Sequence, residues 1–213
     1  MVRHAQNDRP VVAQKSVMRG VFALAASQPD DFGRLEVDLP EVAFWGRSNV
    51  GKSSLINAVT NCKGLARASN TPGRTQQIVF FNIEDRLMFA DLPGYGYAKA
   101  PKAEIAKWNA FIRSYMKKQL RLRCVLLLID ARHGVMPHDA EKMTFLDDLA
   151  VPYRVVLTKA DQAKGGAASC ALAVAKILAK HAAAHPLPLV TCVKTGEGIE
   201  ELREFLNTFA TDR

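Results

Sequence analysis

The segment at 46–53 has the residue types and the spacing of a phosphate-binding loop. It matches the pattern GxxxxGK[ST] throughout, follows the apolar run at 42–45 and leads into a helix-forming run at 54–59. Glycines let successive backbone N–H groups turn toward phosphate oxygens, and the start of a helix adds positive potential. In this interpretation Lys52 neutralises the β- and γ-phosphates, and the Ser53 hydroxyl binds Mg²⁺. The predicted nucleotide contacts of this segment are Gly46, Arg47, Ser48, Asn49, Val50, Gly51, Lys52, Ser53 and Ser54.

A second set of residues, Asp91-Leu92-Pro93-Gly94, follows the apolar run at 87–90. An aspartate at the end of a strand can hold Mg²⁺ through a water molecule, and the Gly94 N–H can detect a γ-phosphate. Alone, this DxxG pattern is more typical of an ordinary turn. Its position downstream of the phosphate-binding loop favours a nucleotide switch.

Two later segments indicate which base is bound. Thr158-Lys159-Ala160-Asp161 follows the apolar run at 155–157, and the Asp161 carboxylate can accept from both N1–H and the 2-amino group of guanine. Adenine lacks this pair of donors, so Asp161 selects GTP over ATP, while the stem of Lys159 can cover the base. By itself the segment is as typical of an ordinary loop after a strand as it is of a base-binding segment. Thr191-Cys192-Val193 is placed to offer a backbone N–H to guanine O6.

The segment Gly73-Arg74-Thr75 lies between the phosphate-binding loop and the next strand-forming run. A threonine hydroxyl in this first switch segment would complete the Mg²⁺ shell when GTP is bound. We choose Thr75 for this role because it directly precedes the run at 78–83, and Thr71 is the alternative.

The hydrophobic pattern predicts the α/β elements that must position these motifs. From residue 41 onward, short apolar runs alternate with longer amphipathic ones, which is typical of a mostly parallel sheet with helices. The close pair of runs at 78–83 and 87–90 predicts a hairpin that places one antiparallel strand at an edge. The expected strands are 41–45, 78–83, 87–90, 124–129, 153–157 and 189–193, and the expected helices are 52–59, 105–120, 138–149, 167–184 and 199–209.

Length and composition limit the class of protein. A chain of 213 residues with 48% apolar and 23% charged residues fits one globular domain. We expect a flexible tail at 1–20 and a single domain at 21–213, with the run at 21–26 entering it as a short helix or strand. Four cysteines without CxxC spacing argue against a zinc site or a disulfide framework and fit a reducing compartment. No apolar run approaches the roughly 18 residues that a membrane-spanning helix needs.

Taken together, the motifs resemble the EngB (YihA/YsxC) family of bacterial GTPases, which belongs to the TrmE-Era-EngA-EngB-septin-like P-loop GTPases. The string DLPGYGYA at 91–98 is the most specific part, and the segments at 41–57, 71–76, 127–134 and 158–161 are also similar. Thr158 stands where Asn is more common, and this is normal for the family. The resemblance implies a Ras-like fold of six strands, one of them antiparallel, with helices on both faces. It also implies a cytoplasmic GTPase that acts in assembly of the large ribosomal subunit and is needed for normal cell division and septation.

The residue after DxxG bears on the rate of hydrolysis. Ras-like enzymes use a Gln there to orient the attacking water, whereas this chain has Tyr95. We therefore predict slow intrinsic turnover, supported by Lys52 and Thr75 and dependent on a partner or an ion. Asn49 either binds a K⁺ that acts in place of an arginine finger or only braces the loop. The alternatives are a nucleotide-dependent binding module with negligible hydrolysis and a small-molecule P-loop kinase, which would give no reason for the segment at 158–161.

Positive charge is concentrated between Lys99 and Arg123. This segment holds eight basic residues and one acid, within a chain of net charge +8. A helical projection puts Lys107, Lys117, Lys118 and Arg121 on one face, with Arg113 at its edge, and puts Ile105, Trp108, Phe111, Ile112, Tyr115, Met116 and Leu120 on the other. Because the segment follows Gly94, one hypothesis is that this face binds ribosomal RNA of the large subunit under the control of GTP, and a solvated charged face is the alternative. We expect neither sequence-specific DNA contacts nor membrane association.

Overall fold

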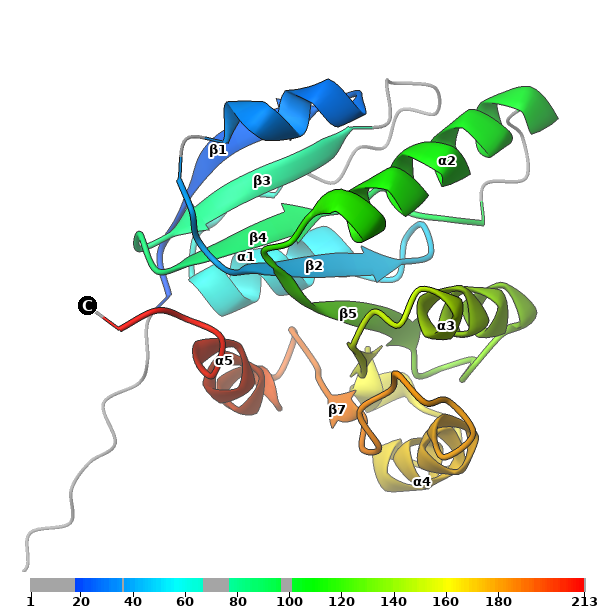
Figure 1. Ribbon diagram of the computed structural model, residues 1–213. Coiled ribbons are helices and arrows are strands. Elements are labelled where there is room, and N and C mark those ends of the chain that lie inside the picture. Colours follow the sequence, from blue (N-terminus) through cyan, green and yellow to red (C-terminus); the bar gives the residue numbers. More distant parts are fainter. Residues whose placement is uncertain (1–17, 36, 67–76, 97–100, 213) are drawn as a thin grey trace, which may run out of the picture.

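The computed structural model describes residues 18–35, 37–66, 77–96 and 101–212, which form a twisted sheet with helices on both faces (Figure 1). The elements in chain order are β1 (Gly20–Ala26), the 3₁₀ helix η1 (Pro29–Arg34), β2 (Glu41–Gly46), α1 (Lys52–Thr60), β3 (Ile78–Ile83), β4 (Leu87–Asp91), α2 (Lys102–Lys118), β5 (Leu122–Asp130), α3 (Pro137–Asp148), β6 (Tyr153–Thr158), the 3₁₀ helix η2 (Ala160–Gln162), α4 (Ala167–Leu178), β7 (Leu189–Val190) and α5 (Ile199–Asn207). The predicted alternation of strands and helices is confirmed.

The described strands form one sheet in the order β1-β3-β4-β2-β5-β6-β7. β2 pairs in parallel with β4 and β5, and β6 pairs in parallel with β5 and β7. β3 is antiparallel to both of its neighbours, β1 and β4. The expected α/β fold with a mostly parallel sheet is therefore confirmed.

Two details of the predicted sheet are wrong. The described residues contain seven strands instead of six, because the run that we left open as a helix or a strand forms β1. β1 pairs along β3 from Gly20 opposite Ile83 to Ala26 opposite Ile78. The hairpin strand β3 is therefore covered by β1 and lies next to the edge of the sheet. Met18, which we placed in the tail, is buried at 3% exposure.

Each face of the sheet carries its own hydrophobic core. The helices α2, α3 and α4 lie on one face of the sheet, and α1 and α5 lie on the other (Figure 1). Side chains of α2, α3 and α4 pack with Phe32 of η1 in one core, and side chains of α1 and α5 pack together in the other. The central strand β2 is buried along its whole length, as is typical of a parallel strand that is covered on both sides. Within the described residues, no helix is both long enough and apolar enough to cross a membrane.

The helix α2 packs on the core through Trp108 and through its second half. Phe111 and Tyr115 lie against Phe32, with 5.5 Å between the ring centroids in each pair. In the first half, the side chains at 103–107, 109 and 110 are exposed. The expectation that Ile105 and Leu120 belong to the buried face is wrong, since they are 40% and 87% exposed. Leu120 lies beyond the end of the helix, so the helical projection does not apply to it.

Three elements near the C-terminus are shorter than predicted, and the smallest difference is in α5, which ends at Asn207 instead of residue 209. α4 ends at Leu178 instead of continuing to 184, because tertiary contacts outweigh the helix propensity of the alanines. Asp147 of α3 accepts from the Ala183 N–H at 3.0 Å and contacts His181 Nδ1 at 2.5 Å. β7 ends at Val190, because the chain then turns so that the Cys192 N–H bonds to the Glu197 carbonyl oxygen.

Candidate functional site

The phosphate-binding loop joins the end of β2 to the start of α1. Gly51 takes a φ of +105° there, a conformation that side chains rarely adopt, and stands at the N-cap of α1. No side chain caps this helix. Its first N–H groups are therefore open to an anion, and the helix dipole favours negative charge at this end. The geometry suits phosphate groups, as the sequence pattern predicts.

The next strand of the sheet brings Asp91 to the phosphate-binding loop. β4 runs parallel to β2, with Asp91 opposite Phe44, and the Leu92 N–H continues the pairing to the Phe44 carbonyl oxygen at 3.0 Å. The Lys52 ammonium group contacts the Asp91 carboxylate directly, and both side chains are largely buried. The two charges offset each other here, so they can be redirected together toward a phosphate and its metal ion. The Leu92 side chain is fully buried in the core and leaves only its backbone for a nucleotide contact.

The threonine in place of Asn at the start of the base-recognition segment bonds to the phosphate-binding loop. The Thr158 hydroxyl donates to the Val50 carbonyl oxygen at 2.7 Å. Lys159, at a φ of +55°, extends its ammonium group to the Asn49 carbonyl oxygen at 2.8 Å. The segment at 158–161 is thus tied to the loop at 46–53 by two hydrogen bonds from adjacent residues.

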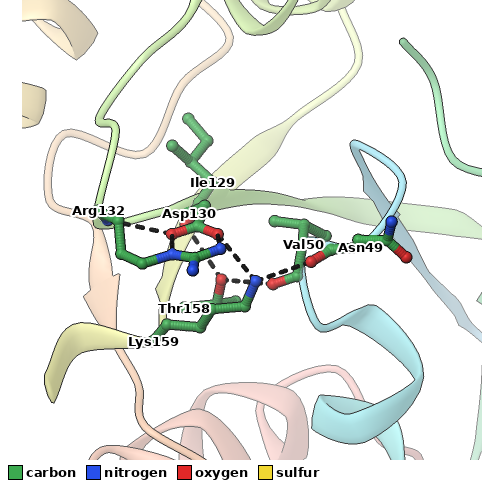
Figure 2. A network of polar contacts seen from close by, with 7 residues as sticks. All are labelled: Asn49, Val50, Ile129, Asp130, Arg132, Thr158 and Lys159. Carbon is green, nitrogen blue, oxygen red and sulfur yellow. Dashed lines mark hydrogen bonds and ion pairs between the residues drawn. The ribbon is translucent and has the colours of Figure 1, made fainter. Parts of the chain in front are cut away.

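An acidic residue that we had assigned no role lies at the centre of this network (Figure 2). Asp130, at the end of β5, accepts from Lys159 Nζ at 2.9 Å and from Arg132 Nε and Nη2 at 2.9 and 2.7 Å. The hydrogen bonds from Arg132 and Lys159 hold the pKa of Asp130 well below its usual range, although burial opposes them. The sequence signal was present: Asp130 ends an apolar strand, and in the parallel register it lies opposite Thr158.

A pocket of about 290 Å³ lies beside this network and suits a planar base. The lining residues are Gly51, Ser54, Thr158, Lys159, Asp161, Gln162, Thr191, Cys192, Val193 and Lys194. The structure therefore brings the two predicted base-binding segments together. The Cys192 thiol lies 3.3 Å from Asp161 Oδ1 and donates to it, so it helps to orient the carboxylate.

The backbone shows which amide of the last segment is available. The Thr191 N–H bonds to the Leu157 carbonyl oxygen at 2.7 Å, and the Cys192 N–H bonds to that of Glu197 at 3.0 Å. Within the described part of the chain, the Val193 N–H has no backbone acceptor. Of the three amides predicted to meet guanine O6, that of Val193 is thus the one left without a backbone acceptor among the described residues.

Three predicted contacts, Gly73, Arg74 and Thr75, lie outside the described residues, as does the alternative Thr71. Asn49 is exposed, at a φ of +66°. Its backbone oxygen receives Lys159, while its side-chain amide points away from the network (Figure 2) and has no hydrogen bond with the described residues. No hydrogen bond of this side chain with the described residues therefore supports the alternative that it braces the loop.

Comparison with known proteins identifies the family. Residues 41–159 match the model of a family described as 50S ribosome-binding GTPase. The chain is 48% identical over 195 residues to the probable GTP-binding protein EngB of Jannaschia sp. strain CCS1, covering 91% of this chain and 86% of that protein. The chain belongs to the EngB family of GTP-binding proteins. It is also 49% identical over 180 residues to the EngB protein of Rhodospirillum rubrum, covering 82% of this chain and 78% of that protein.

Solved structures share the fold. A crystal structure of a probable GTP-binding protein EngB superposes with a TM-score of 0.59 at 24% identity, covering 78% of this chain and 96% of the other. Era, in a complex with MgGDPNP and nucleotides of 16S ribosomal RNA, superposes with a TM-score of 0.59 at 23% identity, covering 84% of this chain and 59% of the other. As a member of the EngB family the chain is a GTPase, and the predicted resemblance is confirmed.

Proposed function

We propose that this EngB-family GTPase is a cytoplasmic, GTP-dependent switch in the assembly of the large ribosomal subunit, and that normal cell division and septation require it. The description of the matching family as a 50S ribosome-binding GTPase supports the ribosomal partner. Era, which shares the fold, has been crystallised with ribosomal RNA, so the same architecture can serve an RNA partner. Because large-subunit assembly supplies the ribosomes that growth needs, its failure would affect division.

The observation that carries the ribosomal proposal is the position of basic residues on α2. Lys107, Arg113, Lys117 and Lys118 are exposed along this helix, which follows the Asp91–Gly94 segment in the chain. Exposed lysines and arginines on one element favour contacts with the phosphate groups of RNA. The affinity of such contacts falls as the salt concentration rises, because the release of counterions from the RNA then contributes less free energy. A change around Gly94 on nucleotide binding would therefore be passed to a surface suited to RNA.

One residue of the predicted basic face does not belong to it. Arg121 lies beyond the end of α2 and is only partly exposed. Its guanidinium group contacts the buried Glu41 carboxylate at 3.2 Å and donates to the Val37 carbonyl oxygen at 2.5 Å. Arg121 is thus not free to contact RNA, because it pairs with a carboxylate that would otherwise be buried without a cation.

The hydrolytic site follows from the residues that the fold places together. Lys52 would bind the β- and γ-phosphates, and the amides of the α1 N-terminus would bind their oxygens. Ser53 and Asp91 are oxygen donors of the kind that Mg²⁺ prefers, and Thr75 is proposed as a further ligand. Bound there, Mg²⁺ would offset charge on the phosphates. Asp161, the stem of Lys159 and the Val193 N–H would select and hold guanine.

We expect slow intrinsic turnover, because no side chain of the described residues occupies the water-orienting role. Tyr95 stands at that position, and its hydroxyl donates to Asp139. The exposed side chain of Asn49 is free to bind a K⁺ ion, which would supply the missing positive charge near the transferring phosphoryl group. A ribosomal partner is the other proposed source of activation.

Binding to isolated large subunits tests the proposal. We expect the chain to sediment with them in the presence of a non-hydrolysable GTP analogue, to bind more weakly with GDP, and to lose affinity steeply as salt rises. The variant Lys117→Glu/Lys118→Glu should lower the affinity about tenfold or more. The matched control is Lys176→Glu/Lys180→Glu, which makes the same charge change at two exposed lysines, one in α4 and one just after it. Equal binding of both variants would contradict α2 as the partner surface.

A further inference from the structure

The side chain that stands in place of the usual glutamine is turned into the protein. Tyr95 is only 9% exposed, and its hydroxyl donates to Asp139 Oδ1 at 2.8 Å. Its ring lies edge-on to Trp45, with 5.3 Å between the centroids. Burial and the neighbouring Asp139 raise the pKa of Tyr95, so the hydroxyl stays protonated and remains a donor. Tyr95 therefore connects the end of the DxxG segment to α3.

The backbone around Tyr95 is paired with the phosphate-binding loop. The Tyr95 N–H bonds to the Gly46 carbonyl oxygen at 3.2 Å, and the Ser48 N–H bonds to the Tyr95 carbonyl oxygen at 3.1 Å. Leu92 is already paired to Phe44, and Pro93 has no N–H. Among the backbone donors from Leu92 to Tyr95, only the Gly94 N–H lacks a backbone acceptor in the described structure. The pairing thus leaves one N–H for a ligand.

The contact between Gly94 and the loop is tight. A Cβ atom added to Gly94 would lie 2.9 Å from Ser48 Oγ, closer than real Cβ atoms come, and 3.0 Å from the backbone nitrogen of Ser48, which is also a tight contact. The backbone of the DxxG segment therefore lies directly against the phosphate-binding loop. A small shift of Tyr95 would move the Gly94 N–H relative to that loop.

Asp139 is held rigidly at the start of α3. It is 2% exposed, and its second carboxylate oxygen accepts from the Met136 N–H at 2.9 Å. One oxygen thus caps the helix and the other receives Tyr95. Leaving a buried carboxylate without one of its hydrogen-bond donors lowers the stability of the folded protein. Asp139 is therefore expected to retain the tyrosine hydroxyl.

We propose that Asp139 and the Tyr95 hydroxyl are positioning residues for GTP: together they hold the DxxG segment on the phosphate-binding loop so that the Gly94 N–H is preset for the γ-phosphate. The inference rests on the proposed role of Gly94 as the γ-phosphate donor. GDP has no γ-phosphate, so its binding does not use this donor. Breaking the bond to Asp139 should therefore weaken GTP binding selectively.

The variant Tyr95→Phe tests this by removing one oxygen atom. We measure its affinity for GDP and for a non-hydrolysable GTP analogue in the presence of Mg²⁺. The affinity for the analogue should fall about tenfold, the size expected for a lost hydrogen bond to a charged group, and the affinity for GDP should stay within about twofold. Equal losses for the two nucleotides, or no loss for the analogue, would overturn the proposal.

The matched control is Tyr115→Phe. Tyr115 also donates to a buried carboxylate, Glu41 Oε2 at 3.1 Å, but at the start of β2, away from the loop. Both variants should lower the unfolding temperature, while only Tyr95→Phe changes the ratio of the two affinities. A changed ratio in Tyr115→Phe as well would reduce the effect to general destabilisation and overturn the assignment.

The variant Asp139→Asn completes a double-mutant cycle. It should reduce analogue binding less than Tyr95→Phe, because the amide oxygen can keep the bond from the Met136 N–H while the amide nitrogen donates to the Tyr95 hydroxyl oxygen. Combined with Tyr95→Phe it should add no further selective loss, since the two residues act through one bond. Fully additive losses would contradict the coupling. A wild-type chain that binds neither guanine nucleotide would instead contradict the proposed function.

Discussion

Asp130 and Lys159 form an ion pair of 2.9 Å that connects two strands to the phosphate-binding loop, because the same ammonium group also donates to the Asn49 carbonyl oxygen (Figure 2). Arg132 holds the other side of the Asp130 carboxylate. The lysine whose stem is to cover the guanine base is thereby held in place by groups of the protein itself. Such preorganisation lowers the entropy that binding must overcome.

Neutralising Asp130 should loosen this lysine. In Asp130→Asn, Arg132 and Lys159 lose the shared carboxylate, and we expect the affinities for GDP and GTP to fall together, by about tenfold. Equilibrium titration with a fluorescent guanine nucleotide measures both. The charge-matched control is Asp148→Asn at the exposed end of α3. Unchanged affinities in Asp130→Asn would show that Lys159 needs no such support.

Removing the Thr158 hydroxyl should affect nucleotide binding and stability together. Thr158→Val keeps the shape but leaves the buried Val50 carbonyl oxygen without its donor, so we expect about 1–2 kcal/mol of lost stability and weaker GDP binding. The control is Thr60→Val, which removes a buried hydroxyl that bonds to the Ile56 carbonyl oxygen within α1. Urea unfolding and GDP titration should show two destabilised variants, of which only Thr158→Val binds GDP more weakly. The same GDP affinity in both would contradict the bridge.

Exchanging the base-recognition carboxylate for an amide should change the preferred base. Asp161→Asn presents a donor where guanine also donates, so the affinity for GTP should fall roughly 100-fold or more, while xanthosine triphosphate should bind. Competition of the two nucleotides for the variant measures the ratio. Cys192→Ala should weaken GTP binding only mildly, because it removes the thiol that orients Asp161 and leaves the carboxylate. Unaltered GTP affinity in Asp161→Asn would contradict guanine recognition by this residue.

The proposed K⁺ activation can be measured directly. The turnover number of the wild type should be higher in KCl than in NaCl at the same ionic strength, by about tenfold if the ion stabilises the transition state as a positive side chain would. In Asn49→Ala the difference between the salts should disappear while GDP affinity is retained, since Lys159 bonds to the backbone oxygen of residue 49. Equal wild-type rates in the two salts would remove the K⁺ proposal and leave a partner as the activator.

A buried carboxylate should make stability depend on pH. Burial raises the pKa of Glu41 to about 7, against the attraction of Arg121 and the hydrogen bonds from Tyr115 and Gln119. Between about pH 4.5 and 7 the folded chain therefore holds a proton that the unfolded chain has released, so the free energy of unfolding should fall as pH rises through this range, by up to about 3 kcal/mol. Urea unfolding of Glu41→Gln, whose amide does not titrate, should lack this contribution. Parallel pH curves for the two proteins would contradict it.

Much of the fold and of the nucleotide site could be predicted because the signals are local. The phosphate-binding loop needs glycines, a lysine and a serine at fixed spacing between a strand and a helix, and all of these are adjacent in the chain. Parallel strands then bring their C-terminal ends to one edge of the sheet, which is why the segments after β2, β4 and β6 meet. Where the local signal was propensity alone, as at the alanines after Leu178, tertiary contacts of Asp147 decided the boundary.

The pairings between distant residues depended on the tertiary structure. Its position at the end of an apolar strand indicates that Asp130 lies near the segment after β6, but not that it pairs with Lys159. No spacing rule connects Tyr95 with Asp139. Arg121 shows the same limit, since the helical projection placed it on the basic face, whereas the fold pairs it with the buried Glu41. By itself the sequence determined which chemical groups are predicted to surround a nucleotide, because each motif is short and continuous. Only the tertiary structure decided which side chains hold those groups in place. The physical reason is that a charged side chain that the fold buries needs a partner of opposite charge, and packing brings that partner from a distant part of the chain.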